Sequence, residues 1–146
     1  MLSTKTKYAL KALLLLADRE GQGPVRIADL AASERIPKKF LEQILLELKH
    51  QGILQSKMGK GGGYSLARPP KAITLGQVVR LFDGSLAPIS CVSHMAYARC
   101  RDCKDERTCG IRQVMKEVRD NTARILDGTT LLDVRRKMRL LSASRR

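Results

Sequence analysis

Four of the five residues from 59 to 63 are glycines, and this run, Gly59-Lys60-Gly61-Gly62-Gly63, restricts the fold more than any other feature of the chain. It separates two short strand-like segments, Ile53 to Met58 and Tyr64 to Ala67. Glycine is unfavourable inside a helix and adopts the backbone conformations that tight turns need. The segment is therefore predicted to be a β-hairpin with a glycine tip, closed by Pro69-Pro70. A nucleotide-binding P-loop fits poorly, because no Gly-Lys-Ser or Gly-Lys-Thr follows at the required spacing.

The residues before the hairpin predict three helices. Apolar residues recur at helical spacing over residues 3–19, 27–34 and 37–51. Pro37 suits the first position of the third helix, and Gly52 is a natural stop after it. The inward stripe of the third helix consists of Leu41, Ile44, Leu45 and Leu48. Helix, turn, helix and hairpin in this order is the layout of a winged helix-turn-helix, so a mainly α fold with a small β-hairpin wing is predicted.

The charge balance favours a polyanionic partner. The chain has 28 lysines and arginines against 14 acidic residues, a formal net charge of +14. Nucleic acid and an anionic membrane surface both fit such an excess. The apolar stretch near the N-terminus is interrupted by Lys11 and followed by Asp18-Arg19-Glu20, which is wrong for a secretion signal, and no run is long enough to span a bilayer. We therefore predict a cytoplasmic protein with no membrane contact.

The third helix and the hairpin are the candidate DNA-binding elements. Gln43 is suited to bond adenine and Glu42 to accept from cytosine, while lysines can meet phosphates or guanine. Glycines at the tip let backbone N–H groups approach a phosphate or a minor groove. The alternatives are a solvated helix face, a merely flexible tip, and a Tyr64 that packs under the wing. The predicted DNA-binding residues are Lys38, Lys39, Glu42, Gln43, Lys57, Lys60, Gly61, Gly62, Gly63 and Tyr64.

Beyond the hairpin, Thr74 and Gln77 predict a capping box that opens a fourth helix, which Asp83-Gly84 ends. The chain is expected to divide into a DNA-binding domain at 1–84, a cysteine-rich loop at 85–110, and a dimerisation helix with a short C-terminal helix at 111–146. Thr130 and Asp133 are expected to cap the last helix, which is predicted to run through Leu141.

The helix after the cysteine loop has a strong apolar stripe: Ile111, Val114, Met115, Val118, Thr122 and Ile125. This stripe could pack on the first helix of its own chain. Pairing with a second copy is favoured, because winged-helix regulators usually bind two half-sites as dimers.

All four cysteines lie in the loop between these helices, with the spacing Cys91-x8-Cys100-x2-Cys103-x5-Cys109. Clustered thiols in a cytosolic chain favour a soft metal. Structural zinc is an alternative, although its usual pattern has two Cys-x-x-Cys pairs. A thioredoxin-like pair would need a βαβ setting that this chain lacks, and a disulfide switch remains open.

Two motifs resemble a known family. Ile36-Pro37-Lys38-Lys39-Phe40-Leu41-Glu42-Gln43-Ile44-Leu45, followed by Gly61-Gly62-Gly63-Tyr64-Ser65-Leu66, is similar to the IscR/NsrR/CymR-type (Rrf-type) bacterial transcriptional regulators. The resemblance implies a dimeric winged helix with the third helix in the major groove and the wing in the minor groove. It places Glu42 where IscR-type members distinguish their site types. Met58 stands where an arginine is common in the family.

The resemblance also implies an iron–sulfur cluster, [2Fe–2S] or [4Fe–4S], because cluster-bearing members carry three cysteines in this loop. Cys91 and Cys109 match the outer two, and Cys100 or Cys103 is the middle one. Arg112 replaces the histidine that completes the set in IscR-type members. The remaining cysteine is expected to fill that place, with His94 in reserve.

The chain is therefore predicted to be a repressor or activator that senses iron–sulfur status, redox state or nitric oxide. The alternatives are a zinc-bound or thiol-switch regulator of the same fold and an electron-transfer protein. An enzyme is not expected, since His50 and His94 are the only histidines and no catalytic set stands out, and no small-molecule substrate is predicted.

Overall fold

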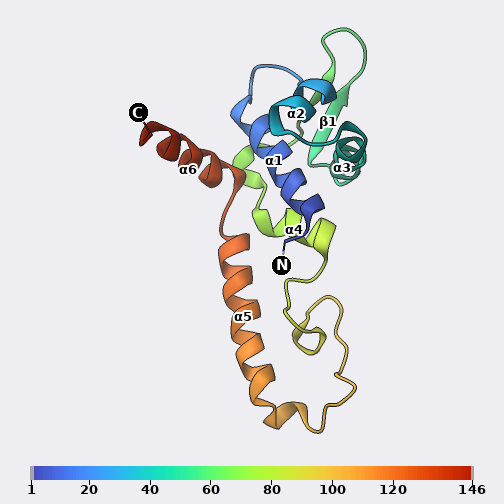
Figure 1. Ribbon diagram of the computed structural model, residues 1–146, viewed down its shortest axis with the longest axis vertical. Coiled ribbons are helices and arrows are strands. Elements are labelled where there is room, and N and C mark those ends of the chain that lie inside the picture. The colour runs from blue at the N-terminus through green and yellow to red at the C-terminus, as the bar shows by residue number, and fades with distance from the viewer. Residues whose placement is uncertain (1, 146) are drawn as a thin grey trace.

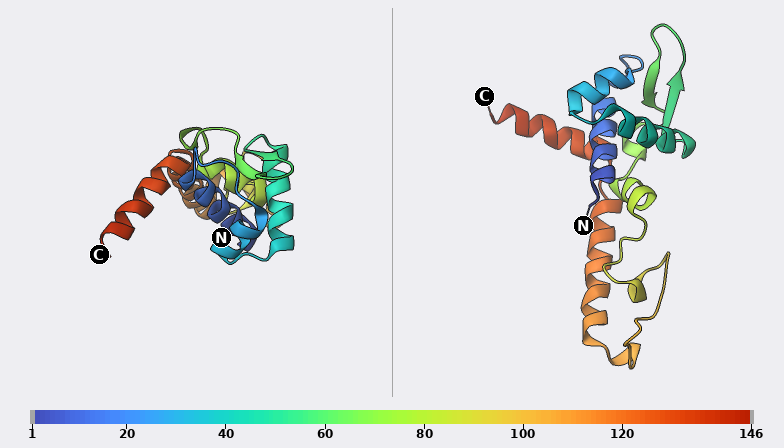
Figure 2. Two further views of the ribbon diagram at one scale, coloured as in Figure 1. Left: turned by 90° about the horizontal axis from the view of Figure 1, so that it is seen from above. Right: turned by 45° about the vertical axis from the view of Figure 1, so that its right-hand side comes forward.

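The computed structural model describes residues 2–145. A winged helix-turn-helix head holds the N-terminal half, and a long helix extends away from it with the cysteine segment alongside (Figure 1). A final helix projects from the head on the side away from the hairpin (Figure 2). The predicted mainly α fold with a β-hairpin wing is confirmed. None of the helices in the part of the chain that the structure describes is both long and apolar enough to cross a bilayer.

Three helices build the head: α1 (Thr4–Asp18), α2 (Ile27–Glu34) and α3 (Lys38–His50). Ser3 caps α1, because its hydroxyl accepts a 3.1 Å hydrogen bond from the Thr6 amide. The predicted stripe of α3 is buried, and its members pack with α1 around a core that is almost wholly aliphatic. The fully enclosed leucines and isoleucines of this core are Leu13, Leu30, Leu41, Ile44, Leu45, Leu48, Ile73 and Leu131.

The turn between α2 and α3 is tight. Arg35 caps α2 in the left-handed region, with φ 55° and ψ 48°, and Ile36 donates a 3.0 Å backbone hydrogen bond to the Ala31 carbonyl. Pro37 was predicted at the first position of α3, and this was wrong by one residue. Pro37 has extended ψ (127°) and is the N-cap, so the helix begins at Lys38.

The wing consists of β1 (Leu54–Lys57) and β2 (Gly63–Leu66), paired antiparallel with Leu54 opposite Leu66 and Lys57 opposite Gly63. Val25 adds a third short strand position, because it exchanges two 2.8 Å backbone hydrogen bonds with Tyr64. The hairpin is thereby fastened to the chain just before α2, and its tip extends beyond the head (Figure 1).

A single turn, η1 (Pro70–Ala72), leads to α4 (Leu75–Asp83), whose Thr74–Gln77 capping box is present as predicted. Asp83 at the end of α4 accepts hydrogen bonds from the Ser3 hydroxyl and from the Ser3 amide, the latter 3.1 Å long. The beginning of α1 is thus tied to the point where the cysteine segment starts.

The only helical elements in residues 85–109 are two single 3-10 turns, η2 (Ser90–Val92) and η3 (Glu106–Thr108). They lead to α5 (Gly110–Asp127), which packs on α4 and η2 rather than on α1. Arg80 of α4 and Asp127 of α5 join the two helices at the end of α5 nearest the head. The Arg80 guanidinium donates two hydrogen bonds to Asp127, of 2.5 and 2.9 Å.

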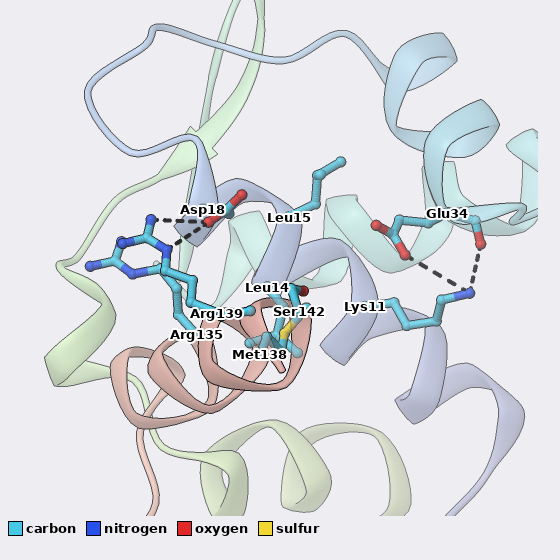
Figure 3. A pocket seen from close by; sticks show the side chains of 10 residues that line it. Lys11, Leu14, Leu15, Asp18, Glu34, Arg135, Met138, Arg139 and Ser142 are labelled. Carbon is cyan, nitrogen blue, oxygen red and sulfur yellow. Dashed lines mark hydrogen bonds and ion pairs between the residues drawn. The ribbon is translucent and has the colours of Figure 1, made fainter. Parts of the chain in front are cut away.

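The last helix, α6 (Leu131–Ala143), returns to α1. Leu131 is fully buried, and Arg135 donates a 2.6 Å hydrogen bond to the carbonyl of Ala17. The outer half of α6 leaves an open groove of about 640 Å³ against α1 (Figure 3). Its charged rim is internally paired, through Lys11 with Glu34 and Arg139 with Asp18.

Candidate nucleic-acid interface and cysteine segment

A hollow of about 520 Å³ lies between α3, the wing and the start of α2. Side chains of α3 form one wall and the hairpin forms the other. Six of the ten predicted DNA-binding residues line it: Lys38, Glu42, Lys57, Gly62, Gly63 and Tyr64. The other four lie on the same two elements and face solvent outside the hollow: Lys39, Gln43, Lys60 and Gly61. The fold therefore brings members of both predicted sets, from helix and hairpin, into one hollow.

Two cations that were not among the predicted site residues also line the hollow. Arg26 is the residue before α2, and Lys49 lies in the last turn of α3. Within residues 2–145, Arg26, Lys38, Lys49 and Lys57 take part in no ion pair, and Glu42 is the only acidic side chain of the lining. The hollow is thus lined by unpaired positive charge, which suits a phosphate backbone. Arg26 lacks a sequence signal, because only the fold places it beside the wing.

The wing glycines are needed by the fold itself. A Cβ at Gly63 would lie 2.3 Å from the Val25 carbonyl oxygen, and one at Gly62 would lie 2.2 Å from that of Lys57. Gly59 and Gly61 both have positive φ, at 85° and 74°. Steric and conformational requirements of the tip therefore account for all four glycines, so their number is not in itself a sign of phosphate binding.

Tyr64 packs under the wing, as one of the alternatives for it held, and it also lines the hollow. Its half-buried ring packs against the core of the head while the residue also lines the hollow. The ring therefore supports the wing from below, at the same position where the backbone pairs with Val25.

The cysteines lie at the other end of the molecule. Cys91 in η2 is only 4% exposed, whereas Cys100 and Cys103 form a turn closed by a 3.2 Å hydrogen bond from the Cys103 amide to the Cys100 carbonyl. Cys109 caps α5, its Sγ accepting a 3.4 Å hydrogen bond from the Arg112 amide. All four are free thiols.

A hydrogen bond with Cys91 raises the pKa of Cys100, and the nearby Asp102 and Cys103 add to the rise. Cys100 therefore has both Cys91 and Cys103 as neighbours. Among the described residues, no three His, Cys, Asp or Glu side chains are arranged to hold a metal ion. His94 is exposed.

Arginines of α5 hold the cysteine segment. Arg119 donates a 2.8 Å hydrogen bond to the Val92 carbonyl, and Arg112 donates a longer one, 3.5 Å, to the Cys91 carbonyl. The Nε of Arg112 is buried without a hydrogen-bond partner. Arg99, within the segment, donates to the carbonyls of Cys103 and Lys104 at 3.3 Å each. These arginines thus order the loop backbone as well as adding positive charge near the thiols.

One known protein family matches most of the chain. Residues 2–137 match the model of the Rrf2 family, described as iron-dependent transcriptional regulators. This chain belongs to the Rrf2 family. It is a DNA-binding transcriptional regulator, and its relatives are regulators rather than enzymes, so the prediction that it is not an enzyme is confirmed.

Individual relatives agree with this assignment. The chain is 43% identical to a putative Rrf2-like regulator of Rhodobacter capsulatus, covering 92% of this chain and 91% of that one. The structure of CymR, the global cysteine regulator of B. subtilis, has a TM-score of 0.79 at 29% identity and covers 94% of this chain and 97% of that one. IscR of T. potens gives a TM-score of 0.75 at 27% identity, covering 94% and 88%. The predicted resemblance is confirmed.

Proposed function

We propose that this Rrf2-family regulator binds duplex DNA as a homodimer, with α3 in the major groove and the wing in the minor groove. The observation that carries the proposal is the hollow between α3 and the wing, lined by unpaired lysine and arginine side chains around the single carboxylate of Glu42. Cations there would neutralise phosphates, and this would supply the part of the affinity that depends on salt. The cytoplasm is the proposed location.

The exposed side chains of α3 are proposed to select the sequence. Glu42 and Gln43 are adjacent and solvent-exposed, and they lie on the face of α3 opposite its buried stripe. A carboxylate accepts from cytosine N4, and a carboxamide bonds adenine at N6 and N7. We assign base recognition to these two residues, and phosphate contacts to Lys38, Lys39, Lys57 and Lys60.

The apolar stripe of α5 supports the homodimer. Four of its residues are largely exposed: Ile111 at 68%, Val114 at 54%, Val118 at 42% and Ile125 at 55%. No residue of this 18-residue helix is buried. A stripe of this length exposed to water is unfavourable, and a second copy of the same helix would cover it symmetrically. The two winged helix-turn-helix heads of the dimer would then contact half-sites whose centres lie about 34 Å apart on the DNA.

We propose that the chain has three functional parts: the DNA-binding head at 1–84, the sensing segment at 85–110 and the dimerisation part at 111–146. The packing of α6 on α1 joins the end of the third part to the first.

The cysteine segment is proposed to hold an iron–sulfur cluster. The donor set fits by its chemistry, because four free thiols lie within 19 residues, and Cys100 has Cys91 and Cys103 as neighbours. Cys91, Cys100, Cys103 and Cys109 would be the ligands, and the group would supply a centre whose gain, loss or oxidation reports iron supply, redox state or nitric oxide. A zinc site or a disulfide switch at the same cysteines is the second candidate, which four thiols also permit.

The connection from the cysteines to the DNA-binding head is proposed to run through α5. Cys109 is the N-cap of this helix. The hydrogen bond from Arg119 ties Val92, the residue after Cys91, to the middle of α5. Ordering or release of the segment would therefore act on the same helix that joins the two copies. A change of a few kcal/mol in DNA affinity is enough for a regulator.

Anaerobic purification tests the cofactor. Visible absorption with iron and acid-labile sulfide near stoichiometric amounts supports the cluster, and each Cys→Ser variant should lose them. Met95→Ser, an exposed side chain of the same segment, is the matched control and should retain them. Stoichiometric zinc without sulfide would overturn the cluster in favour of zinc. If the protein holds neither iron nor zinc and its DNA binding changes on oxidation, the thiol switch is the candidate that remains.

A further inference from the structure

Met58 has the largest exposed fraction, 89%, of the large hydrophobic residues at the surface of the described chain. It directly follows β1 at the tip of the wing, between Lys57 and Gly59, and it lines the hollow that holds Lys38 and Glu42. A methionine that leaves nearly all its surface in water gains nothing from its own fold. Its position on the proposed DNA-binding surface gives it a different role.

The wing tip covers little of this side chain. The backbone turns back at once, with the Gly62 amide donating a 3.0 Å hydrogen bond to the Gly59 carbonyl. Apart from Lys60 the tip is made of glycines, and the close approach of Gly62 to the Lys57 carbonyl fixes the turn. Met58 therefore stands next to a tight turn with most of its side chain in solvent.

We propose that Met58 is the wing residue that enters the DNA minor groove, where it makes an apolar contact with sugars and base edges. The inference rests on the proposed DNA binding. Proteins that use the minor groove commonly place Met, Leu or Phe against base steps. A thioether on a flexible chain adapts to irregular surfaces, and burying it releases water.

The same assignment makes Met58 a specificity residue. A narrow minor groove, as in A·T tracts, has enhanced negative potential that attracts guanidinium and ammonium groups. A methionine has no charge to respond to that potential. The wing of this chain should therefore accept A·T and G·C pairs beneath its tip with little preference, and sequence selection should be concentrated on α3.

Three variants at the tip test the contact in the full-length protein on one duplex obtained by in vitro selection. Met58→Ala should weaken binding roughly fivefold at every salt concentration, as expected for a lost apolar contact. The slope of log affinity against log salt should not change. Lys60→Ala should instead lower the slope by about one, as expected for a lost phosphate contact.

The third variant, Met58→Arg, should bind duplexes with an A·T tract beneath the wing more tightly than matched G·C duplexes. Leu140→Arg on α6 is the control, because it replaces an apolar side chain that is 72% exposed with the same charge far from the wing. It should give no such preference. All four variants should melt like the parent protein, since the replaced side chains support no core.

The outcomes separate the two claims. Parent protein that does not bind duplex DNA would overturn the proposed function. If the parent protein binds DNA, Met58→Ala binds with the same affinity and Met58→Arg shows no A·T preference, the role of Met58 alone is overturned. A reduced salt slope in Met58→Ala would also overturn it, because the loss would then come from displaced phosphate contacts.

Discussion

Arg119 and Val92 are joined by a 2.8 Å hydrogen bond from the guanidinium Nη1 to the backbone carbonyl, which fastens the cysteine segment to the middle of α5. The Arg119 side chain is only 16% exposed and also pairs with Asp120. Because Val92 is itself 2% exposed, this bond lies in a protected place where water competes poorly.

Removing this bond should loosen the segment without unfolding the head. Arg119→Ala is expected to increase amide hydrogen exchange across residues 85–109, by an amount equivalent to about 1.5–3 kcal/mol of local stability. Exchange in α1 and α3 should not change. Arg124→Ala, an exposed arginine on the same helix, is the control. Equal protection of the segment in both variants would show that the hydrogen bond does not hold it.

Two side chains of the hollow should have separable effects on DNA binding. Lys38→Ala should weaken binding similarly on all duplexes and lower the salt slope by about one, because a phosphate contact is lost. Glu42→Ala should change the preferred base at one position, with a discrimination of about 1–3 kcal/mol. Quantitative binding to a panel of single-base variants of one duplex measures both.

Lys71→Ala removes an exposed cation from η1 and should leave the base preference of the protein unchanged. If Glu42→Ala and Lys38→Ala gave the same profile across the panel, α3 would not be the element that recognises bases.

The α5 stripe should be the contact between two copies. Val118→Glu places a carboxylate in the middle of the stripe, and its burial in a dimer would be strongly unfavourable. The variant should therefore halve the molar mass measured by light scattering and reduce affinity for a two-half-site duplex at least tenfold. Folding should be retained, since Val118 is 42% exposed in the single chain.

Gln113→Glu introduces the same charge on α5 outside the stripe and should stay dimeric. A Val118→Glu protein that keeps the mass of the parent would place the dimer contact elsewhere.

The Arg80–Asp127 pair predicts a pH dependence for the joint between α4 and α5. The hydrogen bond from Arg80 holds the pKa of Asp127 below its usual range. A carboxyl with a depressed folded-state pKa contributes stability that is present above its unfolded pKa, near 4, and is lost as the pH falls through the lower folded value. Because the two side chains are 32% and 44% exposed, screening limits the effect to about 1 kcal/mol or less.

Urea unfolding of the parent and Asp127→Asn should therefore differ at pH 7, and the difference should shrink as the pH falls from the unfolded pKa, near 4, through the lower folded pKa of Asp127. Gly76→Ala should act like Asp127→Asn at neutral pH, because its Cβ would lie 1.9 Å from the Asp127 carboxylate and force the pair apart. A difference that persists unchanged in acid would mean that the carboxylate charge is not the cause.

Local signals in the sequence were sufficient for the elements themselves. The capping boxes of Thr74 with Gln77 and Thr130 with Asp133 depend on residues three apart, and both helices begin where these pairs predict. The apolar stripe of the third helix likewise predicted which face of α3 is buried. The one-residue error at Pro37 arose because proline fits the N-cap and the first helical turn almost equally well.

What the sequence could not supply are contacts between distant residues. The placement of Arg26 beside the wing, the docking of Arg135 on Ala17 and the hold of Arg119 on Val92 depend on how finished elements pack, which no local pattern encodes. The wing glycines show the reverse case. Their number suggested phosphate binding, whereas the close approach of Gly63 to Val25 gives them a structural reason.

In vitro selection from a random duplex library with anaerobically prepared protein tests the central claim most directly. Enriched duplexes should carry two half-sites with centres about 34 Å apart, and light scattering should find two chains on each duplex. Binding should fall steeply with added salt. A single chain that enriches no duplex, with its cysteine-bound group intact, would contradict the account.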